Sequence, residues 1–287
     1  MATSTSRSAT RATSVVTSAA HLSATPTIGN HLRDWRQRRR LSQLDLAYEA
    51  NISPRHLSFV ETGRSMPSRE MILRLADQLQ IPMRERNVLL VAAGYAPIFV
   101  ERSLDDPKLE SMRRAIDLVI EGHKPYPAFA INRHWEIVSS NSAIPQLYEG
   151  VAEHLMALPV NAMRISLHPD GLAPRILNLD EWRAHLFMRL RQQIDLTADP
   201  ALVELLRELM EFPAPRPAHR HDTDHYAGAV VPLRIATSIG ELSMFSTTMI
   251  FGTPVDITLA ELAVESFFPA DATTAEIVQR LHARGLA

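Results

Sequence analysis

The segment SQLDLAYEANISPRHLSFVETGRSMPS, residues 42–68, decides the fold of the front of the chain because it encodes two short helices joined by a tight turn. Ser42 is a favourable N-cap, and Asp45 stands at the capping-box position three residues later. Asn51 lies at the turn, which requires a residue that tolerates a positive φ. Ser53 caps the second helix, and a proline follows at its first helical position. This pattern predicts a helix-turn-helix.

The second helix of this motif presents polar side chains that suit the major groove of DNA. Leu57 and Val60 face inward three residues apart, and Gly63 ends the helix. Arg55 can donate two hydrogen bonds to a guanine, and Phe59 can contact a thymine methyl group. An ordinary exposed helix surface is the alternative interpretation of Arg55 and His56. The predicted DNA-binding residues are Gln43, Ser53, Pro54, Arg55, His56, Ser58, Phe59 and Arg64.

A basic helix is expected before the motif. Ile28, Leu32 and Trp35 form its apolar stripe, because their spacing of four and three residues matches one face of a helix. Its other face carries arginines that predict phosphate contacts, with a solvated charged face as the alternative. These arginines are Arg33, Arg36, Arg38, Arg39 and Arg40. Gln43 projects from the next helix N-terminus, where free backbone N–H groups favour a phosphate.

Charge is divided unevenly along the 287 residues, a length that allows about two domains. Residues 1–95 contain 13 arginines against seven acidic residues, whereas residues 96–287 contain 17 basic against 25 acidic residues. A basic front on an acidic remainder predicts that only the front binds a polyanion. The chain has no cysteine, which excludes disulfides, thiolate metal sites and cysteine nucleophiles. No apolar run approaches the roughly 18 residues that span a bilayer.

Composition and periodicity predict a mixed α+β fold in two domains. Five short helices are expected first, then helices near 106–121, 141–149, 179–195 and 199–211, and strands near 126–132, 134–139, 228–236, 240–251 and 257–268. The predicted organisation is a disordered tail (1–27), a helix-turn-helix domain (28–95), a linker (96–104), an α+β domain (105–280) and a C-terminal tail (281–287). The serine- and arginine-rich start also fits a transit peptide or a start codon placed too far upstream.

The motif resembles the XRE/Cro family of helix-turn-helix regulators, whose domain is a five-helix, lambda-repressor-like bundle. The continuation RHLSFVETGRSMPSREMILRLADQLQIPMRERNVLLVAAGYAP resembles the MmyB-like regulators more specifically, as do NRHWEIVSSNSA, LHPDGLAPRILNLDEWRAHL and FGTPVDITLAELAVESFFPAD. The resemblance covers roughly residues 28–280. It implies a PAS-like ligand-binding domain and a small-molecule effector such as a fatty acid. It also implies a phosphate contact by Gln43 and base-reading positions at Pro54, Arg55 and Phe59.

The C-terminal domain is expected to enclose an apolar cavity between its sheet and its helices. The predicted lining residues are Phe129, Trp135, Met163, Leu233, Phe245 and Met249. Ordinary core packing is the alternative for each of these residues. A fatty-acid carboxylate needs a cationic donor, and Arg164 and Arg234 lie in or beside the predicted core elements. An internal salt bridge is the alternative for both arginines.

One segment has the composition of a metal site. His219, His221 and His225 stand within seven residues that also contain two aspartates. The segment follows a proline-rich connection, so a solvated polar loop is the alternative. The sequence contains no nucleophile motif, phosphate-binding loop or paired-carboxylate site, so we expect neither an enzyme nor a required cofactor.

These observations together predict a sequence-specific DNA-binding transcriptional regulator that a small apolar ligand controls. Its expected partners are double-stranded DNA, a second copy of the chain in a homodimer and a small-molecule effector, with no membrane. The expected location is the cytoplasm, at the nucleoid. Two other classes stay open, namely an enzyme with a DNA-binding appendage and a C-terminal protein-interaction module.

Overall fold

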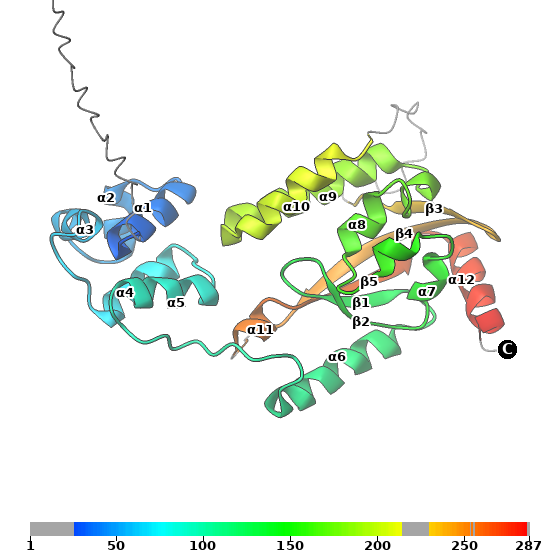
Figure 1. Cartoon of the computed structure of the whole chain (residues 1–287), viewed down its shortest axis with the longest axis horizontal. Coiled ribbons are helices and arrows are strands. Elements are labelled where there is room, and N and C mark those ends of the chain that lie inside the picture. The colour runs from blue at the N-terminus through cyan, green and yellow to red at the C-terminus, as the bar shows by residue number, and fades with distance from the viewer. Residues whose placement is uncertain (1–25, 214–229, 253, 255, 286–287) are drawn as a thin grey trace, which may run out of the picture.

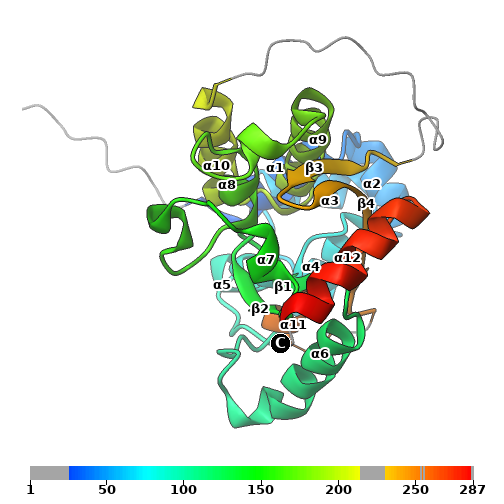
Figure 2. The same cartoon turned by 90° about the vertical axis from the view of Figure 1, so that its right-hand side faces the viewer.

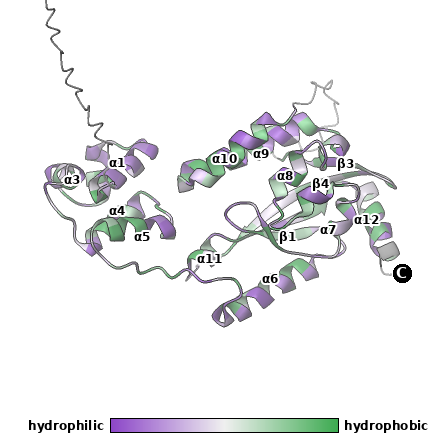
Figure 3. Cartoon of the chain, in the orientation of Figure 1, coloured by the Kyte–Doolittle hydropathy of each residue, from purple (hydrophilic) through white to green (hydrophobic). Residues whose placement is uncertain are grey.

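The computed structural model describes residues 26–213, 230–252, 254 and 256–285 of the chain (Figure 1). The predicted N-terminal tail therefore lies almost wholly outside the described residues. Five helices form the N-terminal bundle: α1 (Ile28–Arg38), α2 (Gln43–Glu49), α3 (Pro54–Glu61), α4 (Arg69–Gln78) and α5 (Met83–Ala92). These are the five short helices that the sequence predicted, and Figure 3 shows that α1 is largely hydrophilic.

The capping signals of the helix-turn-helix are confirmed at the atomic level. Ser42 accepts a hydrogen bond from the backbone N–H of Asp45, and the Asp45 carboxylate accepts one from the N–H of Ser42, which completes a capping box. Ser53 accepts a hydrogen bond from the N–H of His56 at the start of α3. Asn51 has a φ of 53°, the left-handed value that the turn requires.

The bundle has its own apolar core, to which all five helices contribute. Its fully buried side chains include Leu32, Leu46, Leu57, Ile72, Leu75, Leu89 and Leu90. Gly29 allows α1 to approach α3 closely, because a Cβ at this position would lie 2.6 Å from the carbonyl oxygens of Val60 and Glu61. The close packing of α1 against α3 therefore depends on a glycine.

The C-terminal domain surrounds one five-stranded antiparallel sheet in the order β2-β1-β5-β4-β3. The strands are β1 (Ala128–Ile131), β2 (Ile137–Ser140), β3 (Leu233–Thr237), β4 (Gly240–Ile250) and β5 (Ala263–Pro269). The longer helices are α6 (Glu110–Gly122), α8 (Ala162–Leu167), α9 (Leu179–Thr197), α10 (Pro200–Glu211) and α12 (Ala272–Gly285). The short ones are η1 (Pro107–Leu109), α7 (Ile144–Leu147), η2 (Glu153–Met156), η3 (Ala173–Arg175) and α11 (Ile257–Ala260).

The two faces of this sheet carry different layers of helices (Figures 1 and 2). Ala128, Ala130 and Val264 pack with α6 and α11 on one face. Phe129 and Phe267 belong to the larger core on the other face, together with α7, α8, α9 and α10. This alternation follows from the strand period of two residues.

The predicted α+β fold is confirmed, with differences at its ends. The strand predicted near 257–268 divides into the short helix α11 and β5. The expected C-terminal tail is largely helical, since α12 continues to Gly285. The sequence reading also missed α8. Within the described residues, no helix combines the length and the apolar character needed to cross a bilayer.

Gly29→Ala should destabilise the N-terminal bundle by about 1–3 kcal/mol, because the added methyl group meets backbone that cannot rotate away. Thermal or denaturant unfolding would measure the loss. Gly122→Ala is the matched control, since a Cβ at this helical position meets nothing within 4 Å. The control should be neutral or slightly stabilising, and an equal loss in both variants would contradict the steric account.

Candidate DNA-binding surface and ligand cavity

Three of the predicted DNA-binding side chains lie close together on α3 and just after it. The Cζ atoms of Arg55 and Arg64 lie 5.3 Å and 5.9 Å from the centre of the half-buried Phe59 ring. Ser53, Pro54 and Arg55 are exposed at the N-terminus of the helix, and Figure 1 shows α3 on the far side of the bundle from the C-terminal domain.

The other predicted contacts are placed as follows. His56 and Ser58 are half-buried on α3. Gln43 stands at the first position of α2, and its side-chain amide donates a hydrogen bond of 2.7 Å to the Glu61 carboxylate. Its phosphate contact stays a prediction.

Glu61 is a buried carboxylate that joins three helices of the bundle. Arg36 of α1 donates to both of its oxygens, at 2.7 and 2.9 Å, and Gln43 of α2 donates to one of them. Burial by itself raises the pKa of Glu61, but the hydrogen bonds from Arg36 and Gln43 and the nearby charge of Arg33 hold it below its usual range. The recognition helix is therefore oriented by an ionised group.

This network corrects the prediction that all the arginines of the α1 face contact phosphates. Arg36 is only 9% exposed and bound to Glu61, so it cannot reach a phosphate. Arg39 is occupied as well, because it donates hydrogen bonds to backbone carbonyl groups of the bundle and of α9. Arg38 and Arg40 remain exposed. Helical periodicity placed all five arginines on polar positions, but it could not show which of them find partners inside the protein.

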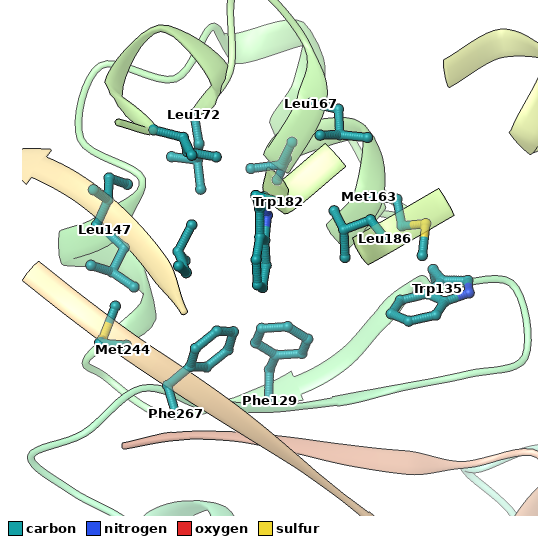
Figure 4. Packing of buried hydrophobic residues seen from close by; sticks show 14 of the residues in the cluster. Phe129, Trp135, Leu147, Met163, Leu167, Leu172, Trp182, Leu186, Met244 and Phe267 are labelled. Atoms are coloured by element: carbon teal, nitrogen blue, oxygen red, sulfur yellow. The ribbon is translucent and has the colours of Figure 1, made fainter. Parts of the chain in front are cut away.

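A small apolar cavity lies between the sheet and the helices above it (Figure 4). Its volume is about 60 Å³. Phe129 and Phe267 lie below this space, and the Trp182 ring of α9 points toward them from above. The polar lining residues are Tyr148, Ser166, Arg189, Ser246 and Glu265.

Four of the six predicted lining residues border this cavity, namely Phe129, Trp135, Met163 and Leu233. Phe245 and Met249 were assigned to the wrong face of β4. Phe245 stacks on Phe268, and Met249 pairs with Val264, on the face that carries α6. Met244 and Ser246 alternate with them on the other face, where Met244 joins the larger core and Ser246 lines the cavity. Strand alternation was predicted correctly, but it does not specify which set is internal.

The two arginines proposed as carboxylate donors are also corrected. Arg164 forms a bidentate ion pair with Glu208, at 2.7 and 2.8 Å. Arg234 pairs with Glu241 at 2.6 Å, across neighbouring strands. Neither arginine lines the cavity. The alternative of internal salt bridges therefore holds for both.

Among the described residues that line the cavity, Arg189 is the cation, and the sequence analysis did not predict it. Its guanidinium binds Glu265 of β5 and Thr248 of β4, and its Cζ atom lies 4.8 Å from the centre of the Trp135 ring. Glu265 is 2% exposed. One signal was available, since Arg189 follows Trp182 by seven residues and so shares its helix face. The nearby His185 has a lowered pKa, mainly because it is desolvated and also because Arg189 is close.

The predicted metal-binding residues His219, His221 and His225 lie outside the described residues. Among the described residues, His154, His168 and Asp170 are one group whose ligand atoms lie within 4.8 Å of one another. His168 Nδ1 accepts a hydrogen bond of 3.0 Å from the backbone N–H of Asp170. The Nδ1 atom of His168 is therefore already engaged with the backbone of its own loop.

Two family profiles match the chain. The MmyB-like transcription regulator ligand binding domain matches residues 112–281, and a helix-turn-helix domain matches residues 27–89. The chain is similar to the PAS domain of BvgS from Bordetella pertussis, with 15% identity and a TM-score of 0.22, over 61% of this chain and 97% of that one. It is also similar to an RNA-binding light-oxygen-voltage receptor, with 11% identity and a TM-score of 0.24, over 90% of this chain and 63% of that one. No curated protein sequence matches.

Glu61→Gln should destabilise the bundle by about 3–5 kcal/mol, because Arg36 would stay buried without its anion. In the unsubstituted protein, the lowered pKa means that this stabilisation is present at neutral pH and is lost as the pH falls through the folded-state pKa. Unfolding measured from neutral to acidic pH checks both effects. The exposed Glu49→Gln on α2 is the control, and a change of similar size there would exclude the network as the cause.

Proposed function

The chain belongs to the MmyB-like transcription regulators and joins a helix-turn-helix domain to their ligand-binding domain, and we propose that it reads a specific operator under the control of a small apolar ligand. The observation that carries this proposal is the pairing of an exposed recognition helix with an apolar cavity in a separate domain. The first supplies contacts to DNA, and the second supplies a place for an effector.

The exposed end of α3 supports specific DNA binding. Arg55 can reach the edge of a guanine, and Phe59 offers an apolar surface for a thymine methyl group. Arg38, Arg40 and Arg64 are exposed and can neutralise phosphates. We place a homodimer on a pseudo-palindromic site in the nucleoid, with two recognition helices about 34 Å apart, as Cro-type domains bind.

The cavity supports an uncharged or weakly acidic apolar ligand, with a fatty acid as the chosen candidate. Arg189 is the group that can hold its carboxyl, but Glu265 already occupies this guanidinium. A second carboxylate beside Glu265 would repel it in a site of low dielectric constant. One of the two carboxyl groups must therefore carry a proton when the acid is bound.

Arg55→Ala should weaken binding to the selected operator by about 1–3 kcal/mol and relax the base preference at one position. The operator is first selected from random duplexes, and fluorescence anisotropy then measures affinities over a range of salt concentrations. Arg38→Ala is the matched control on an exposed arginine. It should weaken all duplexes alike and lower the salt slope by about one.

Equal binding of the unsubstituted protein to every duplex, with only a salt-dependent component, would contradict the proposed operator reading. An Arg55→Ala variant that keeps both affinity and base preference would remove this residue from the set that reads bases.

Decanoic acid should bind more weakly as the pH rises, by about tenfold per pH unit above its pKa, because one proton accompanies it into the cavity. Decanol carries no such group, and its affinity should be independent of pH. Quenching of Trp135 and Trp182, which line the cavity, can report both ligands. Binding of the acid with no pH dependence would contradict the role given to Glu265. Failure of both ligands to bind would contradict the ligand class.

A further inference from the structure

Two sets of hydrogen bonds join the DNA-binding bundle to the C-terminal domain, and they end on different layers of that domain. Arg39 at the end of α1 donates to the carbonyl oxygens of Asp195, at 2.9 Å, and Leu196, at 3.1 Å, in the last turn of α9. Arg84 in the first turn of α5 forms a bidentate ion pair with Glu261, which lies just before β5. The first contact depends on the position of a helix, and the second depends on the position of the sheet.

Arg39 is held firmly on the bundle side of its contact. Its guanidinium also donates to the carbonyl oxygens of Leu79, at 2.8 Å, and Gln80, at 3.2 Å, at the end of α4. Its Cζ atom lies 5.2 Å from the centre of the Trp35 ring. Ala198, directly after α9, packs against the core of the bundle. The last turn of α9 is therefore connected through Arg39 to both α1 and the end of α4.

The same helix forms a wall of the ligand cavity. α9 runs without interruption for 19 residues, which is about 28 Å. Trp182, Leu186 and Arg189 line the cavity from successive turns of α9. Gln193, one turn after Arg189, accepts a hydrogen bond of 2.7 Å from Nε1 of Trp135, another lining residue. One rigid element thus joins the cavity to Arg39.

The cavity is too small for the proposed ligand unless its walls separate. Its space is about 60 Å³, whereas a cavity of about 150 Å³ is needed to hold benzene. The floor is a sheet whose strands are hydrogen-bonded to their neighbours. The start of α9 is tied to that floor, because the backbone N–H of Leu177, just before the helix, donates to the carbonyl oxygen of Arg234 in β3. Beyond its start, the described contacts of α9 with the sheet are made by side chains such as Arg189, so α9 yields by turning about its start when a ligand enters. Packed cores respond to such insertions by shifts of whole elements.

We propose that α9 transmits ligand occupancy to the DNA-binding bundle through Arg39. The inference rests on the proposed function, because it describes how the ligand cavity controls DNA binding. When α9 moves away from the sheet, the Arg39 contact moves with it while the Arg84–Glu261 contact stays. The bundle then turns about Arg84, which changes the position of α3 and hence the fit of two recognition helices to their half-sites.

The absence of cysteine from the sequence allows a direct test in the full chain. One pair of introduced cysteines, at Gln37 of α1 and Val203 of α10, carries spin labels on the two sides of the contact between Arg39 and α9. A second pair, at Val88 of α5 and Ala260 of α11, carries them on the two sides of the contact between Arg84 and Glu261. All four positions are exposed. Electron paramagnetic resonance then measures both distances with and without dodecanoic acid as the probe.

We expect the distance between Gln37 and Val203 to shift by about 2 Å or more on addition of the probe, as helices shift at interfaces, while the second distance stays constant. Arg39→Lys, which keeps the charge but loses the planar fork to four carbonyl groups, should produce the shift without the probe. Arg38→Ala is the control, since this exposed neighbour should change neither distance.

Ala162→Phe provides a test that needs no ligand. Ala162 lines the cavity from α8, so the added ring should force α9 outward and reproduce the same shift. If the probe shows no binding by its effect on the melting temperature, the ligand class has failed, and this variant alone decides the coupling. If the probe binds or the ring is accommodated and neither distance changes, the coupling through α9 is wrong while the proposed function stands.

Discussion

The separation between α9 and the sheet is the constraint on which the rest of this protein depends. It is set by apolar packing of Trp182 over Phe129 and Phe267 and by the ion pair of Arg189 with the buried Glu265. Removing one partner of a buried ion pair costs about 3–5 kcal/mol, so this contact resists loss. The apolar packing between α9 and the sheet, by contrast, can loosen by small displacements. The interface therefore combines a fixed polar point with an apolar region that can open around a ligand.

The DNA-binding bundle also contains a buried ion pair, and there the pair fixes the orientation of α3. The Glu61 carboxylate is buried and satisfied by Arg36 and Gln43, which fixes α3 relative to α1 and α2. The side chains left at the surface of α3 are then presented in one orientation. The DNA-binding bundle is rigid, whereas α9, the movable wall of the cavity, can shift. A displacement of α9 can therefore move the whole bundle.

Local sequence patterns such as helix caps and turns predicted the bundle well. The cavity was predicted less well, because its residues depend on partners that are distant in the sequence. Caps and turns depend on neighbouring residues, so Ser42, Ser53 and the left-handed Asn51 could be predicted from the sequence. The face of β4 could not be predicted, because which set of alternating residues is internal depends on what packs against the sheet. The role of Arg189 depends on Glu265, 76 residues away. Buried polar partners at such separations leave no periodic signal.

The most direct test of the central claim is the affinity of the full chain for its selected operator, measured with and without saturating ligand. A regulator of the proposed kind should change its operator affinity by about 5–150-fold, which corresponds to a coupling free energy of about 1–3 kcal/mol. The ligand should show the same factor in reverse, binding with an affinity that depends on the presence of operator. An operator affinity that stays constant while the ligand demonstrably fills the cavity would contradict the account.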